Sequence, residues 1–595
     1  MPNASEFPTL PSRPWRLRVT PGDEILNHPY AGEGTDEKPF VVGWLPDDVE
    51  NPMSFRYSYK WIATMIGAVA VLAVTMASSM LSAALFDIER EFPGKTTQEY
   101  ILVTSIFVLG FVVGPLLWAP CSEIFGRRKM FIFTYLPFTA FNAGVCGAKS
   151  LDTLLVLRFF AGMFGSSPLT SAGGVIADMF PADQRGLAMG IFAAAPFLGP
   201  AIGPVAGGFL AEAASWKWVA AVIACFAALL TILGTVFSPE TYAPVLLRQR
   251  AARLAKFTGK VYIAQPDAGK PKVPPKSLFA NQMKKPWELL FKEPIVLLMA
   301  LYMAIIYAIL YMQFTSFPIV FQRARGWSPG IAGLAFVGIT VGAFASLGYI
   351  VLYENKRYAK KMHAAGGYLA PEQRLPSVIG GSILLPAGLF IFAWTGTPVT
   401  IPWIAPLIGT VLFGAGLVLV FLGIMNYLVD AYLIYAASVL AGNTIVRSIF
   451  GVVFPLFTST IYTNLGIHWA GTLIACLAVL FMPAPLIFYL YGSRIRRASR
   501  YSREADDFGK MMAQKVKAMM LAKAQAQAAN APVPGTTAGE SAEVKSDLAR
   551  EEEAVEALGE ELHRATTQTG AGDAVATKLE QVEELKEGEA RQRST

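Results

Sequence analysis

The chain has 595 residues, of which 54% are hydrophobic and 16% are charged, and its formal net charge is +7. Soluble domains carry about 25% charged residues, so this composition excludes an ordinary soluble protein and indicates a membrane protein. The four cysteines lack CxxC spacing and the four histidines are widely scattered. The sequence therefore predicts no metal site and no cofactor.

Apolar runs long enough to cross a bilayer, which takes about 20 residues, follow one another along most of the chain. We predict six spans at 61–86, 100–121, 130–148, 152–177, 187–211 and 217–237, and six more at 294–321, 330–353, 376–395, 402–428, 432–462 and 468–491. The expected fold is an all-α polytopic membrane protein of twelve transmembrane helices. Its expected parts are an N-terminal segment (1–60), a six-helix bundle (61–237), a basic central loop (238–292), a second six-helix bundle (293–492) and a largely flexible C-terminal tail (493–595).

The orientation follows from the Lys and Arg residues in the loops, which concentrate on the cytosolic side. With the N-terminus inside, the inward loops carry 20 such residues and the outward loops carry 6. Both termini and the central loop are therefore expected in the cytosol. We interpret the central loop as a flexible tether, with binding to anionic lipid headgroups as the alternative. Because the positive charge is spread over several loops, no nucleic-acid partner is expected.

The stretch "GPAIGPVAGG" (199–208) places helix breakers inside a predicted span. Gly199, Gly203 and Gly207 are spaced i, i+4, i+8 and form one smooth stripe, which lets helices approach closely in lipid. Pro200 and Pro204 remove backbone hydrogen bonds and bend the helix. The pattern indicates a close-packed seam, which either only packs the fold or also slides and seals as the bundle changes shape.

A charged cluster lies in "WAPCSEIFGRRK" (118–129), between the second and third predicted spans. Glu123 can pair with Arg127 or Arg128, or can lie at a helix N-terminus. Exposed pairs are worth about 0–1 kcal/mol, so such a pair can act as a reversible latch between the two halves. The alternative is a cluster that only sets the topology.

Arg158 lies seven residues into its predicted span. A charge at that depth costs at least about 2.5 kcal/mol and indicates a functional site. No carboxylate lies near the span centres to pair with it, so the guanidinium can instead hold backbone or hydroxyl groups.

Other polar residues of the spans occur in pairs spaced i, i+4, so each pair shares a helix face. Polar side chains that share a face in this way can make hydrogen bonds between helices. The pairs contain Ser78, Ser82, Tyr307, Tyr311, Asn426, Asn443 and Arg447.

Several of these segments together resemble the major facilitator superfamily. "GPAIGPVAGG" is similar to its antiporter motif in the fifth helix, and "LLVLRFFAGMFGSS" (154–167) to its fourth-helix motif. "WAPCSEIFGRRK", "DDVENPMSFRYSYKW" (47–61) and "NTIVRSIFGVVFPLF" (443–457) resemble segments of fungal twelve-span drug:proton antiporters. The loop motif departs from the usual pattern, with Ala119 and Glu123 in place of Gly and Asp. The resemblance covers roughly 44–500.

The resemblance implies that the first, fourth, seventh and tenth helices line a central cavity, and that Arg158 couples proton binding to conformational change. The paired polar residues Ser78, Ser82, Tyr307, Tyr311, Asn426, Asn443 and Arg447 thereby become candidates for lining the cavity, with a hydrogen bond between helices or an aromatic side chain at a helix interface as the alternative. It implies proton-coupled efflux of a small amphipathic molecule, such as a drug, a polyamine, a secondary metabolite or an organic acid. The alternatives are a facilitator or importer, and a substrate sensor with the same fold. No GxxxxGK[ST] loop and no catalytic motif occurs, so we expect neither an ATP-driven pump nor an enzyme. The expected partners are the bilayer, the substrate and protons. We expect a monomer in the plasma membrane, with the vacuolar membrane as the alternative.

Overall fold

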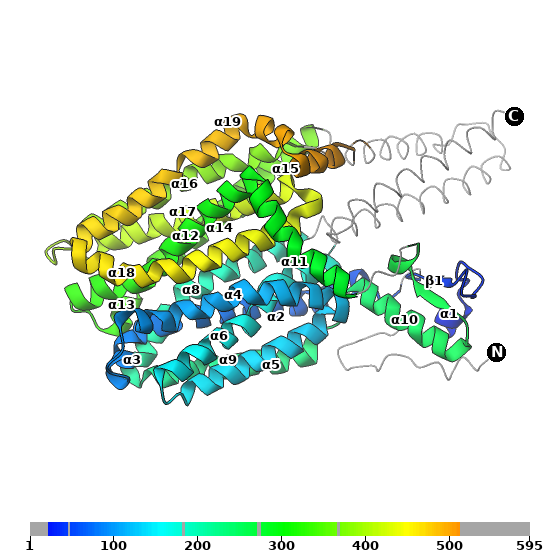
Figure 1. Ribbon diagram of the computed structural model, residues 1–595, viewed down its shortest axis with the longest axis horizontal. Helices are drawn as coiled ribbons and strands as arrows, with labels where there is room; N and C mark the ends of the chain where they lie inside the picture. Colours follow the sequence, from blue (N-terminus) through cyan, green and yellow to red (C-terminus); the bar gives the residue numbers. More distant parts are fainter. Residues whose placement is uncertain are drawn as a thin grey trace, which may run out of the picture.

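Two groups of long helices lie side by side in the computed structural model, which describes residues 22–45, 48–180, 185–269, 275–365, 369–511 and 514. In Figure 1 the first group is blue to cyan and the second is green to orange, and the helices of both run along the long axis of the molecule. One end of this axis carries α3 and α13 and is called here the α13 end. The other end carries α10, α11 and α15 and is called the loop end.

The first group follows the predicted spans closely. Its helices are α2 (Tyr57–Ser79), α3 (Leu85–Glu91), α4 (Thr97–Phe125), α5 (Arg127–Cys146), α6 (Leu151–Gly165), α7 (Ser167–Met179), α8 (Arg185–Ala213) and α9 (Trp216–Phe237). A 3-10 segment, Met80–Ala84, joins α2 to α3. Local signals set several boundaries: Thr96 and Glu99 form a capping box at the start of α4, and Gly126, with φ 99°, separates α4 from α5.

The second group contains α12 (Pro294–Phe317), α13 (Pro329–Gly333), α14 (Ala335–Tyr349), α15 (Asn355–Ala364), α16 (Leu375–Thr395), α17 (Ile404–Ala431), α18 (Ala436–Phe481) and α19 (Pro483–Ala498). Two π-helical segments, Pro318–Ala324 and Ile350–Glu354, extend α12 and α14. Gly466, with φ 72° and ψ 171°, interrupts α18. This glycine therefore marks the turn between the eleventh and twelfth predicted spans.

In the described part of the chain, ten helical segments are long and apolar enough to cross a membrane. One of them, Leu433–Ala498, runs through the interruption at Gly466 and so contains two of the predicted spans. The third predicted span corresponds to α5, which is not among the ten. The all-helical membrane fold is therefore confirmed, while the exact count of twelve crossings stays a prediction.

The first part of the central loop is folded rather than a tether. It contains α10 (Ala243–Thr258) and strand β2 (Tyr262–Ala264), which pairs in parallel with β1 (Phe40–Val42) of the N-terminal segment. Arg250 donates to Asp48 at 2.5 Å and to Glu50 at 2.8 Å, and all three side chains are buried. A buried charge needs such partners, so this ion triad joins two segments that are 200 residues apart.

The second part of the loop, α11 (Pro275–Lys292), is bound by the chain that follows α19. Tyr501 donates its hydroxyl to Glu288 at 2.7 Å, and Tyr432 and Ser499 both contact Glu293. Residues 500–511 are helical, so the predicted flexible tail begins later than 493. The remainder of the predicted tail lies outside the described residues.

Candidate functional site

Arg158, on α6, is 1% exposed and is held by backbone carbonyl groups. Its Nε donates to Val103 at 3.0 Å, its Nη1 to Ala77 at 2.8 Å and its Nη2 to Ser78 at 3.2 Å. The guanidinium also lies 4.4 Å from the centre of the Phe107 ring. Two of the acceptors lie in the last turn of α2, where helical carbonyls need outside donors and favour a positive charge. The sequence left backbone groups or hydroxyl groups as the partners of Arg158, and the structure shows hydrogen bonds to backbone carbonyl groups.

A chain of hydroxyl groups connects this turn of α2 to the second group of helices. The Ser78 hydroxyl donates to the Thr75 carbonyl at 2.7 Å and lies 2.9 Å from the Tyr311 hydroxyl on α12. Tyr307 donates to Tyr311 at 3.4 Å. Since each hydroxyl can donate once and still accept, the chain runs from Tyr307 through Tyr311 and Ser78 to the backbone. It is a direct polar contact between the two halves.

Arg447, on α18, lies next to Tyr307, the residue at which this series of hydroxyl groups begins. Its guanidinium is 4.8 Å from the centre of the Tyr307 ring and 4.9 Å from that of Phe421. Its Nε is buried and has no hydrogen-bond partner. One turn earlier, Asn443 is 1% exposed; its Nδ2 contacts the Met303 sulfur at 2.9 Å, and its Oδ1 has no partner. Sequence-predicted cavity residues from three helices therefore meet around one site.

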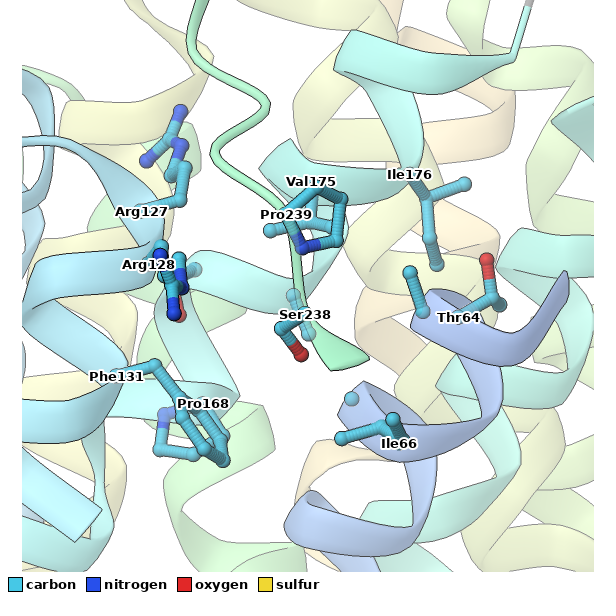
Figure 2. Close-up of a pocket in the computed structure, with 14 residues that line it drawn as sticks. Thr64, Ile66, Arg127, Arg128, Phe131, Pro168, Val175, Ile176, Ser238 and Pro239 are labelled. Carbon is cyan, nitrogen blue, oxygen red and sulfur yellow. The ribbon is translucent and has the colours of Figure 1, made fainter. Parts of the chain in front are cut away.

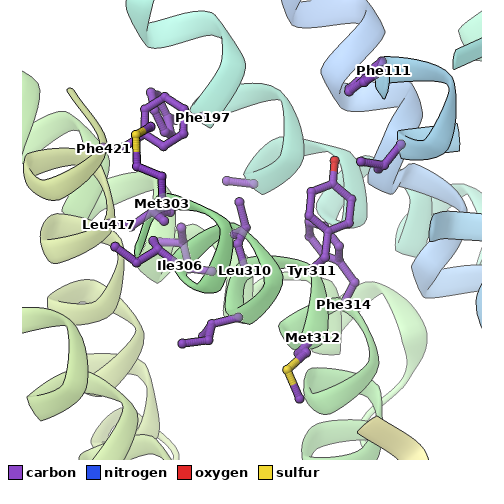
Figure 3. Close-up of a cluster of buried hydrophobic side chains, with 14 of the residues drawn as sticks. Phe111, Phe197, Met303, Ile306, Leu310, Tyr311, Met312, Phe314, Leu417 and Phe421 are labelled. Carbon is purple, nitrogen blue, oxygen red and sulfur yellow. The ribbon is translucent and has the colours of Figure 1, made fainter. Parts of the chain in front are cut away.

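Apolar side chains enclose this region. Figure 3 shows Phe197 of α8 beside Phe421 of α17, with Met303 next to them and Tyr311 farther along α12. The two phenyl rings meet edge to face at 4.8 Å. Phe197 and Phe421 could not be predicted as site residues from the sequence, because each is one apolar residue among many in its span.

Two predicted cavity residues do not join this cluster. Ser82 is 2% exposed, but its hydroxyl has no partner among the described residues. It lies in the 3-10 segment after α2, where three residues complete a turn, so it does not share the α-helical face of Ser78. Asn426, on α17, is exposed and makes no described contact with the cluster.

The glycine stripe of α8 packs against the same turn of α2. A Cβ atom on Gly199 would lie 2.8 Å from the Met76 nitrogen, and one on Gly203 would lie 2.8 Å from the Met76 carbonyl oxygen. At Gly207 a Cβ atom would lie 3.0 Å from the carbonyl carbon of Met80. The predicted close approach is thus present, within the first group of helices. The α8 stripe, Arg158 and Tyr311 all converge on the turn Thr75–Met80, which we call the hub.

The prolines of the motif lie inside a continuous helix. Pro200 and Pro204 are both buried in α8, which also contains Pro196. A Cβ atom on Gly333 of α13 would lie 2.6 Å from the Pro204 carbonyl oxygen. That carbonyl therefore faces the second half of the protein at close range, where protein covers it.

The end of α8 also contacts α13 directly. A Cβ atom on Gly208 would lie 3.0 Å from the carbonyl carbon of Pro329 and 3.2 Å from the Cα of Gly330. Glu212 accepts a hydrogen bond from the Gly330 backbone at 3.0 Å. The motif thus has two packing faces, one within its own half and one toward the other half.

At the loop end, Glu240 rather than Glu123 lies at the N-terminus of α5. It accepts backbone hydrogen bonds from Arg127 at 2.9 Å and Arg128 at 3.3 Å. The Arg128 side chain donates to the Thr235 carbonyl at 2.9 Å, and Arg127 pairs with Asp178 at 3.5 Å. Glu240 lies three residues after the end of α9 (Phe237), and its place just after a span is the feature of the sequence that indicates this role.

The pairing of Glu123 with Arg127 or Arg128 stays a prediction, and Arg127 also has other partners in this conformation. Arg127 donates to Ser122 at 2.7 Å and lies 5.0 Å from the centre of the Tyr242 ring, and Glu123 is near enough to act on its charge. These contacts of Arg127 join α4, α5, α7 and the chain after α9. They hold the first half together and do not reach the second.

A small cavity of about 40 Å³ lies beside this cluster, between α2, α5 and α7. Figure 2 shows Arg127, Arg128 and Phe131 on one side of it, and Thr64 and Ile66 on the other. It lies within the first half, away from the hub. The described residues contain no group of three or more His, Cys, Asp or Glu that could hold a metal ion.

The carboxylates of the described spans lie near the span ends, whereas Arg158 and Arg447 lie deeper. Arg158 is held by carbonyl dipoles, and Arg447 contacts two aromatic rings. The acidic residues of these spans are Asp87, Glu89, Glu91, Glu99, Glu123, Asp152, Asp178, Glu212, Glu354, Glu372 and Asp430. In the part of the chain that the structure describes, Arg158 and Arg447 therefore carry positive charge with no carboxylate paired to either of them.

Comparison with known proteins gives concordant matches. The family model of the Major Facilitator Superfamily matches residues 67–455. The chain is 52% identical over 533 residues to the MFS-type efflux pump MFS2 of Trichophyton rubrum, covering 89% of each chain. It is 49% identical over 563 residues to the major facilitator superfamily multidrug transporter mdrA of Aspergillus fumigatus, covering 94% of this chain and 92% of the other.

A solved structure has the same fold. The proton:xylose symporter XylE superposes with a TM-score of 0.53 at 15% identity, covering 73% of this chain and 96% of that chain. At that identity the match concerns the fold alone.

Proposed function

The chain belongs to the major facilitator superfamily, and we propose that it exports a small amphipathic molecule across a membrane, driven by a proton gradient. The relatives named above are an efflux pump and a multidrug transporter, and they match nearly the whole chain. Family and relatives are transporters rather than enzymes. Export by alternating access, in which two bundles rock about a central site, fits the two side-by-side groups of helices.

The observation that carries the proposal is the convergence of three elements on the hub. Arg158 and the α8 stripe hold Thr75–Met80 from within the first half, while Tyr311 reaches it from the second. Rocking of the halves has to break or remake the Ser78–Tyr311 contact. A molecule bound beside Tyr307 and Arg447 is therefore next to the contact that changes.

Proton coupling rests on Arg158 and on carboxylates near the span ends. Arg158 keeps a fixed positive charge beside the hub, which stabilises the break between α2 and its 3-10 segment. Asp178, whose side chain is 14% exposed and paired with Arg127, is the carboxylate that we assign to proton uptake at the loop end. Protonation of Asp178 would weaken its ion pair with Arg127 and so weaken the contact between α5 and α7. We assign Glu123 and Arg128, which lie next to Arg127, to the same group of charges at the loop end.

We further propose that both termini and the loop end face the cytosol, and that the protein works as a monomer in the plasma membrane. The excess of Lys and Arg at this end supports that orientation. A single cysteine at residue 260, in the central loop, should resist an impermeant reagent added to intact cells. A cysteine at 399, at the α13 end, should react; the reverse pattern would overturn the orientation.

The function is tested with purified protein in vesicles under an imposed pH gradient, with the neutral amphipathic dye Nile red as the probe. We expect accumulation against the dye gradient that disappears when the pH gradient is collapsed. Arg158→Ala should abolish it, and Arg158→Lys should restore it in part, because the ammonium keeps the charge but not the fork of donors. Arg90→Ala, whose side chain is 83% exposed, is the matched control. Dye movement that ignores the pH gradient would indicate a facilitator instead, and no movement at all would favour a sensor.

A further inference from the structure

The central arginines differ in what occupies their N–H groups. Arg158 donates from all three of its nitrogens to carbonyl oxygens and is fully engaged. Among the described residues, the buried Nε of Arg447 has no hydrogen-bond partner, and the guanidinium lies against the rings of Tyr307 and Phe421. A buried N–H group without a partner is costly, so a ligand that accepts a hydrogen bond from Arg447 is favoured.

We propose that Arg447 and Asn443 bind the carboxylate of a small organic acid, whose apolar body lies against Tyr307, Phe421 and Phe197. This inference rests on the proposed function, because it names the class of molecule that the transporter carries.

The donor set suits a carboxylate. The guanidinium presents a planar fork that matches two carboxylate oxygens. Asn443 lies one turn away on the same face of α18, and its amide N–H contacts only the Met303 thioether, a weak acceptor. A carboxylate oxygen is a stronger acceptor and can take that N–H. The two side chains can thus hold one anionic group together.

The aromatic side chains around Arg447 suit the apolar part of such an acid. Phe421 lies against both Arg447 and Phe197, and Tyr307 covers the guanidinium from the α12 side. Figure 3 shows Met303, Ile306 and Leu417 in the same buried apolar cluster as Phe421 and Phe197. An acid with an aromatic or aliphatic body can therefore bury its body here while its charge meets Arg447.

The same charges argue against a polyamine. With Arg158 and Arg447 at the centre and the carboxylates of the described spans near their ends, a polycation would meet repulsion at the site. Of the four substrate classes that the sequence left open, the structure therefore favours organic acids, including acidic secondary metabolites.

Two probes of the same shape test the proposal: 9-anthracenecarboxylate, which is ionised at neutral pH, and the neutral 9-anthracenecarboxamide. Their affinities are measured by fluorescence titration of the purified full chain. We expect the carboxylate to bind about tenfold more tightly or better, as for hydrogen bonds to a charged group. Arg447→Gln should remove this preference and Arg447→Lys should keep part of it. Arg500→Gln is the control, because Arg500 also lies near a tyrosine ring, 5.9 Å from that of Tyr501, but at the surface.

Asn443→Asp is a second, nearly isosteric test that leaves Arg447 in place. The new carboxylate should pair with the guanidinium, lower the affinity for the anionic probe about tenfold and leave the neutral probe unchanged. Equal affinity of the wild type for both probes, or a preference that survives both Arg447→Gln and Asn443→Asp, would overturn the proposal. Nile red transport separates the two claims: pH-driven export without a carboxylate preference refutes only the inference, and a preference without export refutes only the proposed function.

Discussion

Single methyl groups added to the two packing faces of α8 should have different consequences. A Cβ atom on Gly208 would collide with the carbonyl oxygen of Pro329 and lie 3.0 Å from its carbonyl carbon and 3.2 Å from the Cα of Gly330, in the other half of the protein. A Cβ atom on Gly203 would lie 2.8 Å from the Met76 carbonyl oxygen, in the same half. Overpacking of this kind typically costs about 1–3 kcal/mol. At Gly208 the clash is relieved when the two halves of the protein separate. At Gly203 it is relieved only when α2 and α8 move apart within the first half.

Gly208→Ala is therefore expected to shift the balance between conformations by about 1–3 kcal/mol, or roughly 5- to 150-fold in population, with little change in thermal stability. Gly203→Ala is expected to lower the free energy of unfolding by a similar ~1–3 kcal/mol. Gly380→Ala is the matched control, because nothing lies within 4 Å of a Cβ atom there. It gains helix propensity of up to about 1 kcal/mol and should be neutral or slightly stabilising.

Thermal unfolding and the distance between spin labels at the exposed positions 214 and 399, both at the α13 end, measure the two effects separately. Gly208→Ala should widen the distance distribution, and Gly203→Ala should lower the melting temperature. The assignment of the two faces would be refuted if Gly208→Ala left the distances unchanged, or if both variants changed the same readout in the same way.

Three further predictions concern other contacts of the structure. Tyr311→Phe removes the hydroxyl that joins the halves, worth about 0.5–1.5 kcal/mol, and should widen the same label distances; unchanged distances would remove this contact from the conformational change. Arg250→Met removes the buried cation that Asp48 and Glu50 share, at a cost of about 3–5 kcal/mol, and should expose the central loop to proteolysis; an unaltered digestion pattern would contradict the ion triad. Lys292, on α11 itself, and Tyr501, on the C-terminal segment, lower the pKa of Glu288 from 4.5 to about 2. The part of this shift that Tyr501 causes is lost when the segment leaves, so binding of the C-terminal segment to α11 should be complete above pH 4.5 and weaken as the pH falls toward 2. Quenching between labels on the two segments reports this, and a loss of binding that begins on raising the pH would have the wrong sign.

The spans were predictable because hydropathy and local caps specify them. The ninth predicted span, 376–395, differs by one residue at its start from α16, Leu375–Thr395. The break after α2 was not predictable in the same way, because "SSMLSAALF" contains no Gly or Pro. It is stabilised by Arg158, a residue about 80 positions away, and pairing over that separation leaves no local pattern.

The central loop did contain a signal that its basic charge obscured. In "VLLRQRAARLAKF" the apolar residues recur at helical spacing, and Leu247, Ala251 and Leu254 are buried on one face of α10. Excess positive charge is compatible with a folded segment when partners such as Asp48 neutralise it. The partner lies far away in the sequence, so charge alone favoured a tether.

The choice between antiport and facilitation is tested most directly by proton movement. Vesicles with purified protein and a trapped pH indicator receive a pH gradient, and its collapse is followed with and without Nile red. Proton-coupled export predicts that Nile red speeds the collapse in wild-type vesicles, but not in Arg158→Ala or protein-free vesicles. Movement of the dye with no accompanying proton flux would contradict the account.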